Sequence, residues 1–171
     1  MRVLTIFFLV LVGIFMIDQG IKTWAVSTAY EIQHAKSLSM PISESTLVGT
    51  TLLKGQCIDL ELHFNKGVAF SMFAFLGPYM KWIQSALVLF LLYILFKEDY
   101  LERYAFPAGL LIGGALGNVY DRFVHEGVVD YVAWHCGFSY AVFNFADVAI
   151  DLAFVILIVM VYFFPEKSEA K

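Results

Sequence analysis

The chain has 171 residues, of which 60% are hydrophobic and 15% are charged, and its mean hydropathy is +0.76. This composition is far from that of an average soluble domain, and the formal net charge of −4 gives no sign of nucleic-acid binding. A helix needs about 20 residues to cross the hydrocarbon core of a bilayer. We therefore predict an all-α integral membrane protein with four transmembrane helices, at roughly residues 3–25, 79–96, 104–122 and 145–164.

The first apolar stretch also has features of a secretory signal peptide, because Arg2 precedes an apolar core. No small-x-small cleavage motif follows this core closely. The chain continues instead as D-Q-G-I-K-T-W, at residues 18–24. We therefore expect a first helix that is retained in the mature protein.

One sizeable segment, at roughly residues 27–77, separates the first two predicted spans. Residues 43–51 are rich in Ser, Thr and Gly, as is typical of a loop. Residues 57–64, C-I-D-L-E-L-H-F, alternate apolar and polar side chains with the period of a half-buried strand. We expect a small β-containing segment on the membrane surface, while the structure of residues 23–36 stays open. Four spans would place Cys57 and Cys136 on one side of the membrane, where a disulfide could form although no C-x-x-C pattern supports one.

The third predicted span carries a stripe of small residues. Three glycines recur every four residues and so share one helix face: Gly109, Gly113 and Gly117. Such a stripe allows a neighbouring helix to approach closely. Counting by fours from Gly114 leads to Asn118 and Arg122, so polar groups continue a tightly packed, inward-facing stripe.

Polar side chains gather at one end of the predicted bundle. In a four-span arrangement the same side of the membrane holds Asp18, Lys22, Asn65, Asn118, Asp121, Arg122, Asp130, Asn144 and Asp147. Ionisable groups at membrane depth cost several kcal/mol unless they are paired, and they usually mark a functional interior. The sequence therefore predicts a polar site at one membrane face.

Carboxylates are the strongest catalytic candidates at this site. Zinc-ligand spacing is absent among the histidines His63, His125 and His135, which argues against a metal site. No base is evident beside the candidate nucleophiles Ser71, Cys136 and Ser139. Asp130 follows the third span and Asp147 opens the fourth, so two helix ends could bring them together. Two aspartates that share one proton can activate water and protonate a leaving group, which is aspartic-type amide hydrolysis.

Five motifs follow one another along the chain: D-Q-G-I-K, F-N-K-G-V-A-F, G-G-A-L-G-N-V-Y-D-R, V-V-D-Y and F-N-F-A-D. Together they resemble the lipoprotein signal peptidase family, also called signal peptidase II. The resemblance implies that residues 1–171 form a single membrane-embedded aspartyl peptidase domain without metal or cofactor. It implies partners as well, namely membrane lipids and prolipoproteins that carry a diacylglyceryl group on the lipobox cysteine, whose signal peptide the enzyme removes. Lys and Arg are almost evenly divided between the two sides, and charge density only slightly favours a cytoplasmic turn at Lys97–Arg103. The resemblance implies an inner-membrane protein with cytoplasmic termini and an extracytoplasmic active site.

Carried over residue by residue, the resemblance implies that Asp130 and Asp147 are the catalytic pair. It implies substrate-binding or supporting roles for Asp18, Lys22, Asn65, Gly114, Asn118, Asp121, Arg122 and Asn144. We expect Asn118 and Arg122 to hold the substrate backbone. Asp121 is expected to be structural, pairing with Arg122 or capping backbone groups.

The chain departs from the family pattern at three places. Lys66 stands in the N-K-G motif where a small neutral residue is more usual, and the segment between Lys22 and Asn65 is longer than typical. Asp151 lies one turn deeper than Asp147, at a position that is normally uncharged. We interpret Asp151 as a neutral or hydrogen-bonded packing residue rather than a third catalytic acid.

Two other classes of function are weighed against a peptidase. A small proton-coupled transporter or channel would need polar groups along the full membrane depth, whereas residues 87–96 and 152–164 are almost purely apolar. A non-catalytic assembly or anchoring protein would explain the spans but not the paired aspartates.

Overall fold

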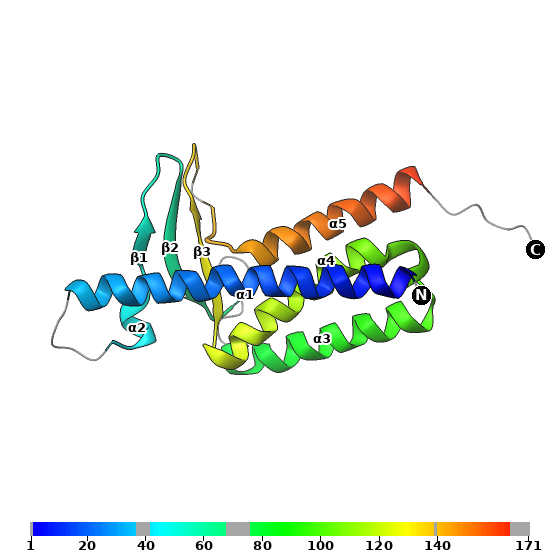
Figure 1. Cartoon of the computed structure of the whole chain (residues 1–171), viewed down its shortest axis with the longest axis horizontal. Coiled ribbons are helices and arrows are strands. Elements are labelled where there is room, and N and C mark those ends of the chain that lie inside the picture. Colours follow the sequence, from blue (N-terminus) through cyan, green and yellow to red (C-terminus); the bar gives the residue numbers. More distant parts are fainter. Residues whose placement is uncertain (1, 37–41, 68–75, 139, 165–171) are drawn as a thin grey trace, which may run out of the picture.

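The structure is a computed structural model that describes residues 2–36, 42–67, 76–138 and 140–164. Its long helices run side by side along the longest axis of the molecule (Figure 1): α1 (Arg2–Lys36), α3 (Gly77–Lys97), α4 (Leu101–Val124) and α5 (Phe145–Phe163). The other elements gather at one end of the bundle: the short helix α2 (Glu44–Leu47) and the strands β1 (Thr50–Leu53), β2 (Ile58–Asn65) and β3 (Val128–Trp134). At the opposite end α1 begins and α5 ends, so the sheet lies away from the start of α1 and the end of α5.

Three of the long helices, α1, α3 and α5, are long and apolar enough to cross a membrane. Their outward faces expose large apolar side chains, among them Leu9, Leu89 and Val155. Such a continuous apolar surface suits contact with lipid rather than with water. The predicted architecture, a mainly helical membrane fold with a small sheet, is therefore confirmed.

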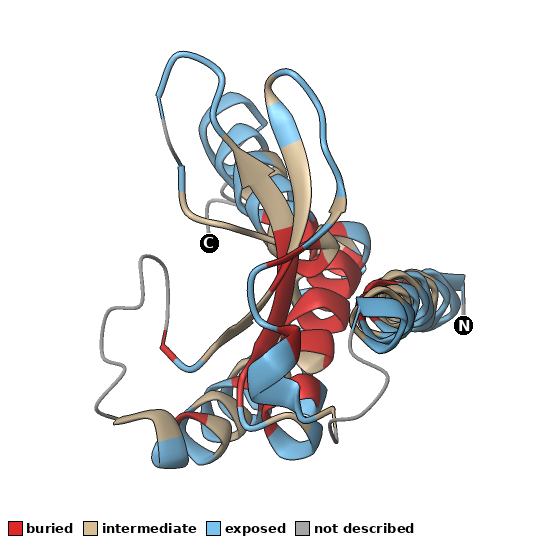
Figure 2. Ribbon diagram, turned by 90° about the vertical axis from the view of Figure 1, so that its left-hand side faces the viewer, coloured by how far each residue is buried: buried red, intermediate tan, exposed pale blue. Residues whose placement is uncertain are grey.

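Helix α4 occupies the centre of the bundle. It packs against α1, α3 and α5, and Figure 2 shows the buried residues gathered at the middle of the molecule. Its glycines and polar side chains make it less apolar than its neighbours, so length and composition alone do not identify it as a membrane span. Because the other helices surround it, α4 needs fewer large apolar side chains than they do.

The predicted glycine stripe packs as expected. A Cβ atom added at Gly109 would lie 2.8 Å from Cβ of Val10, and one at Gly113 would lie 2.7 Å from the carbonyl oxygen of Leu11, so both glycines admit α1. Gly114 faces the other neighbour, because its added Cβ would lie 2.7 Å from the carbonyl oxygen of Ala146 on α5. The small residues of α4 thus let two helices approach it on different faces.

Helix α1 is longer than predicted. It has 35 residues, or about 52 Å at a rise of about 1.5 Å per residue, whereas the hydrocarbon core is about 30 Å thick. The structure of residues 23–36 could not be predicted from the sequence. They form the outer part of this helix, where Ala25 and Ala29 pack against Leu62 and Val129 of the sheet. We expected a segment outside the membrane at residues 27–77, but its first part, up to Lys36, continues helix α1. Residues 37–41 and 68–75 of this segment are outside the described residues.

The sheet is antiparallel with the order β1–β2–β3. Strand β2 coincides with the alternating stretch that predicted it. Strand β3 was not predicted, because its first four residues are all buried and its sequence therefore does not alternate. It pairs with β2 so that Asp130 lies opposite His63. Asp130 consequently sits on a strand, and the expectation that a helix end carries it was wrong.

Candidate active site

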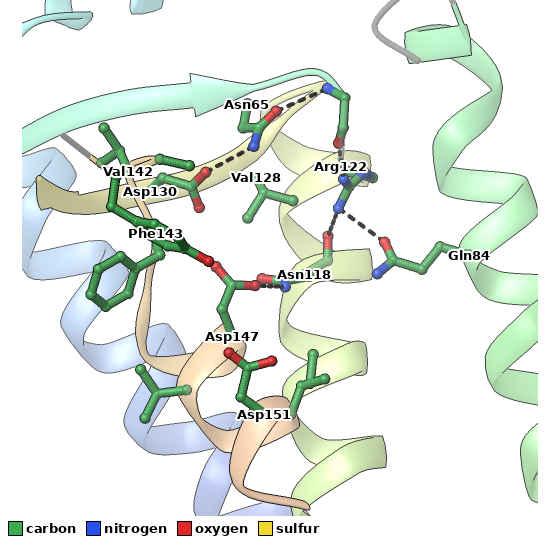
Figure 3. A pocket seen from close by; sticks show the side chains of 15 residues that line it. Asn65, Gln84, Asn118, Arg122, Val128, Asp130, Val142, Phe143, Asp147 and Asp151 are labelled. Atoms are coloured by element: carbon green, nitrogen blue, oxygen red, sulfur yellow. Dashed lines mark hydrogen bonds between the residues drawn. The ribbon is translucent and has the colours of Figure 1, made fainter. Parts of the chain in front are cut away.

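A cavity of about 600 Å³ opens where the sheet meets the helices, between β3, α4 and α5. Figure 3 shows acidic, amide and guanidinium side chains from these different elements facing it. The residues around it that the sequence had nominated are Asn65, Asn118, Arg122, Asp130, Asp147 and Asp151. The remainder of its wall is mostly apolar and includes Val142, Phe143 and Ile150. Such a mixture of apolar wall and converging polar groups is typical of a substrate site.

Asp130 enters the cavity from β3 and is only 3% exposed. Its Oδ2 accepts a hydrogen bond from Nδ2 of Asn65 at 3.1 Å, and its Oδ1 accepts one from Nδ2 of Asn144 at 2.8 Å. Burial raises the pKa of Asp130 to about 7, the charge of Asp147 adds to this rise, and the two amide hydrogen bonds oppose it. Asp130 can therefore exchange a proton near neutral pH.

Asp147 enters the same cavity from the first turn of α5. Asn144 caps this helix: its Oδ1 accepts the N–H of Asp147 at 3.0 Å, while Oδ2 of Asp147 accepts the N–H of Asn144 at 3.1 Å. The other carboxylate oxygen accepts a hydrogen bond from Nδ2 of Asn118 at 2.9 Å. Asn144 thus donates to both carboxylates, through its side-chain Nδ2 to Asp130 and through its backbone N–H to Asp147, and fixes their relative positions.

A buried ion cluster lies behind the cavity. Nζ of Lys22 contacts Asp18 at 2.8 Å, Asp121 at 2.7 Å and Oδ1 of Asn118 at 2.9 Å. Each carboxylate of this cluster also accepts a backbone N–H, from Ala146 on α5 in the case of Asp18 and from Val129 on β3 in the case of Asp121. The cluster therefore ties α1, α4, α5 and β3 together. The expectation that Asp121 binds backbone was correct, but its ion partner is Lys22 and not Arg122.

Arg122 closes the side of the cavity that faces α3. Its Nη1 donates to Oε1 of Gln84 at 2.9 Å and to the carbonyl oxygen of Asn118 at 3.3 Å (Figure 3). Its Nη2 donates to the carbonyl oxygen of Gly67 at 2.6 Å. The guanidinium thus holds the turn after β2 against α4.

Three polar residues around the site were missed by the sequence reasoning. Gln84 had been noticed only as an interruption of an apolar stretch, yet it accepts a hydrogen bond from Arg122. Gln19 donates to Asp121 at 2.9 Å, and although it stands in the D-Q-G-I-K motif no role had been given to it. The hydroxyl of Tyr131 accepts the N–H of Phe145 at 3.1 Å, and burial raises the pKa of Tyr131 to about 12, so it stays neutral.

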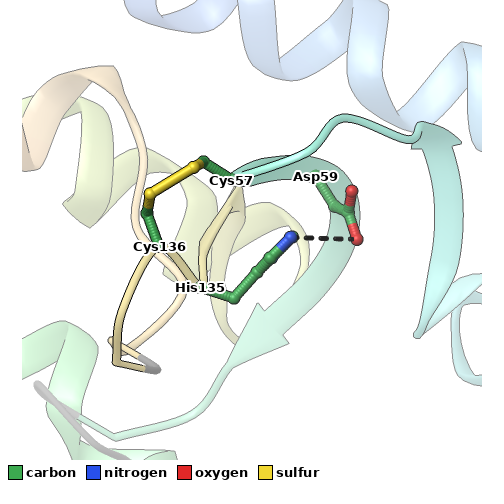
Figure 4. The surroundings of a disulfide bond; sticks show 4 residues. All are labelled: Cys57, Asp59, His135 and Cys136. Atoms are coloured by element: carbon green, nitrogen blue, oxygen red, sulfur yellow. Dashed lines mark ion pairs between the residues drawn. A yellow bond between two sulfur atoms is a disulfide. The ribbon is translucent and has the colours of Figure 1, made fainter.

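None of the alternative catalytic groups among the described residues lines the cavity. His63 pairs with Glu61 at 2.8 Å and His125 with Glu44 at 2.6 Å, and neither lines the cavity. Ser71 and Ser139 are outside the described residues. Cys136 forms a disulfide with Cys57, which joins the residue before β2 to the loop after β3 (Figure 4). The disulfide left open by the sequence is thus present, and it removes Cys136 as a nucleophile.

Comparison with known proteins gives this site a family. Residues 10–163 match the family described as signal peptidase (SPase) II. The chain is 60% identical to a lipoprotein signal peptidase of Sulfurovum sp. (strain NBC37-1), over 98% of this chain and 100% of that one. It is 48% identical to a lipoprotein signal peptidase of Sulfurimonas denitrificans, over 96% of this chain and 92% of that one.

A solved structure shares the fold at much lower sequence identity. It is described as a bacterial membrane enzyme, and it matches with a TM-score of 0.73 and 20% identity over 96% of this chain and 92% of that one. The resemblance expected from the five motifs is therefore confirmed, and the chain belongs to the signal peptidase II family.

Proposed function

We propose that the protein removes the signal peptide from diacylglyceryl-modified prolipoproteins, by hydrolysis between Asp130 and Asp147. The observation that carries this proposal is the convergence of two aspartates, one from β3 and one from α5, on one cavity, where both bond to Asn144. The relatives named lipoprotein signal peptidase support the class of substrate. The cut falls on the N-terminal side of the lipidated cysteine.

The two carboxyl groups divide the proton transfers. Asp147 takes a proton from water as the water oxygen attacks the scissile carbonyl carbon. Asp130, whose pKa of about 7 lets it hold a proton near neutral pH, gives that proton to the leaving nitrogen as the C–N bond breaks. A proton then returns from Asp147 to Asp130, so the pair ends as it began.

The other polar residues hold this pair and the substrate. Asn65, Asn118 and Asn144 donate hydrogen bonds that fix the two carboxylates. Arg122 and Asn118 hold the substrate backbone. Asp18, Lys22 and Asp121 brace the elements that carry the site, and Gly114 lets α5 approach α4 closely enough to bring Asp147 to it.

The whole chain acts as one peptidase domain in the bacterial inner membrane, with α4 as the fourth span. Its termini lie in the cytoplasm, and the sheet and cavity lie at the extracytoplasmic face. The apolar faces of α1, α3 and α5 support placement in a membrane, and membership of the signal peptidase II family supports the orientation.

The decisive experiment compares three substitutions of one type in purified protein. Asp130→Asn and Asp147→Asn keep the size of the side chain but remove proton exchange, so each should abolish cleavage of a lipidated precursor while binding persists. The double variant should be little worse than either, because the pair acts as one unit. Asp151→Asn is the matched control one turn below Asp147 and should keep substantial activity. An inactive Asp151→Asn beside an active Asp147→Asn would show that the second catalytic carboxylate is Asp151.

A second experiment tests the lipid requirement. A diacylglyceryl-modified precursor and its unlipidated twin are incubated with the protein, and cleavage is followed by mobility on a gel. We expect only the modified precursor to be cut, because acyl chains in the bilayer bring the scissile bond to the cavity, with each buried methylene contributing about 0.8 kcal/mol. Equal cleavage of both precursors would contradict the proposed substrate.

A further inference from the structure

A second, smaller cavity of about 180 Å³ lies at the first turn of α3, and Arg122 lines both cavities. Its wall consists of Lys66, Gly77, Pro78, Lys81, Arg122 and Glu126. Three of these side chains are cationic and one is a carboxylate, so the cavity has an excess of positive charge. The mechanism proposed above uses neither of the two lysines.

Arg122 presents an unused donor here. The residue is 6% exposed, and its two Nη atoms are bonded to Gln84, Asn118 and Gly67. Its Nε is buried, and no hydrogen-bond acceptor reaches it within the part of the chain that the structure describes. Buried donors in native proteins nearly always have a partner, so this N–H points to an acceptor that the described residues do not supply.

The start of α3 adds further donors. Gly77 and Pro78 form its first turn, and no side chain caps the helix. The first N–H groups of a helix have no acceptor within the helix, and together with the helix dipole they favour an anion. Pro78 has no N–H, so the first turn contributes the N–H of Gly77 and the positive end of the helix dipole to a cavity that a buried guanidinium also lines.

Both lysines are held near this position. The ammonium of Lys81 lies 5.6 Å from the centre of the Phe123 ring, a cation–π contact that directs it toward α4. Lys66 lies in the turn after β2, between two anchored neighbours. Oδ1 of Asn65 accepts the N–H of Gly67 at 3.0 Å, and the carbonyl oxygen of Gly67 accepts a hydrogen bond from Arg122. The ammonium of Lys81 and the backbone on either side of Lys66 are thus anchored beside the cavity that both residues line.

Aromatic side chains mark the depth of this site in the membrane. Tyr79 and Trp82, on the first turns of α3, are 64% and 62% exposed. The rings of Trp82 and Phe123 pack edge to face, with their centroids 5.3 Å apart. Exposed Trp and Tyr residues on a membrane helix concentrate where lipid headgroups meet the hydrocarbon. The anion available in abundance at that level is the phosphate of a membrane phospholipid.

We propose that this cavity, the Lys66–Lys81 site, binds the phosphate group of an anionic membrane phospholipid. An anionic headgroup is preferred to a zwitterionic one because a choline or ethanolamine would bring its own positive charge to a site that is already cationic. Arg122 also contacts Asn118 and the turn that carries Asn65, both of which reach the aspartates of the larger cavity. A lipid at this site therefore stabilises the position of residues that hold the active-site carboxylates.

The test measures binding of phosphatidylglycerol to the intact protein in detergent by native mass spectrometry, without any peptide substrate. Lys66→Gln and Lys81→Gln should each weaken binding about fivefold, the effect of one basic residue near a lipid surface. Lys54→Gln is the matched control, because Lys54 is exposed between β1 and β2 and does not line the cavity; it should bind as the unchanged protein does. Phosphatidylcholine should bind weakly and equally to all four proteins.

Equal affinity of all four proteins for phosphatidylglycerol would overturn the proposal. Inorganic phosphate is added in a separate titration, and binding as tight as that of the lipid would overturn the lipid assignment in favour of a free anion. Thermal unfolding of each variant verifies that the substitution leaves the fold unchanged. Because no cleavage is measured, failure of this proposal is distinguishable from failure of the proposed peptidase activity.

Discussion

Removal of the Lys22 ammonium should strongly destabilise the protein. Lys22 is 2% exposed and contacts two carboxylates that are themselves 0% and 1% exposed, on Asp18 and Asp121. The substitution Lys22→Met keeps most of the aliphatic side chain but leaves two buried carboxylates without their cation. Breaking a buried ion pair in this way costs roughly 3–5 kcal/mol. For a chain of this size that corresponds to a fall in Tm of about 6–20 °C.

The assay is thermal unfolding in detergent, followed by intrinsic tryptophan fluorescence. Lys36→Met is the control, because Lys36 lies exposed at the end of the same helix. The triple variant Lys22→Met, Asp18→Asn, Asp121→Asn removes all three charges and should recover most of the loss, since neutral replacement of a complete buried ion cluster is often tolerated. A Tm of Lys22→Met within 2 °C of the control, or a triple variant less stable than Lys22→Met, would refute the electrostatic argument.

Three further predictions concern pH, metals and the disulfide. The pKa of Asp130 is about 7 in the folded state and 3.8 in the unfolded chain, so the unfolded state loses this proton first as the pH rises. The free energy of unfolding of the unchanged protein should therefore fall, relative to that of Asp130→Asn, by up to about 4 kcal/mol between pH 4 and 8. A Tm difference that is constant with pH would contradict this. EDTA should leave cleavage intact, because the described residues contain no group of three potential metal ligands; activity lost to EDTA and restored by zinc would reverse the aspartyl assignment. Cys57→Ser should lower the free energy of unfolding by about 4 kcal/mol, since the bond closes a loop with a sequence separation of 79, and an unchanged Tm would argue against its formation.

Much of the architecture could be predicted because it depends on local composition. In α3, α4 and α5 the helices begin and end within three residues of the predicted bounds. The spacing of four between Asp18 and Lys22 and the glycine stripe of α4 are also local patterns, and both behave as helical geometry requires. The polar residues that the motifs nominated meet around the cavity and the adjoining ion cluster.

The errors arose where structure depends on partners far along the chain. Strand β3 does not alternate because the sheet and the helices bury its first residues together. The outer part of α1 is helical because Ala25 and Ala29 find a sheet to pack against. The suggested pairing of Asp121 with Arg122 overlooked that adjacent residues of a helix point in different directions, whereas Lys22 approaches Asp121 from another helix.

The three-stranded sheet has a consequence for the biogenesis of the protein. Strands β1 and β2 belong to the segment between α1 and α3, whereas β3 belongs to the segment between α4 and α5. A nascent chain that ends after α3 therefore presents a two-stranded hairpin with an open edge, and that edge stays unpaired until β3 has been synthesised. Asp130 arrives only with that later segment, and Asp147 arrives with the helix α5 that follows it. Completion of the sheet thus coincides with completion of the proposed dyad, and a chain that ends before β3 and α5 has neither.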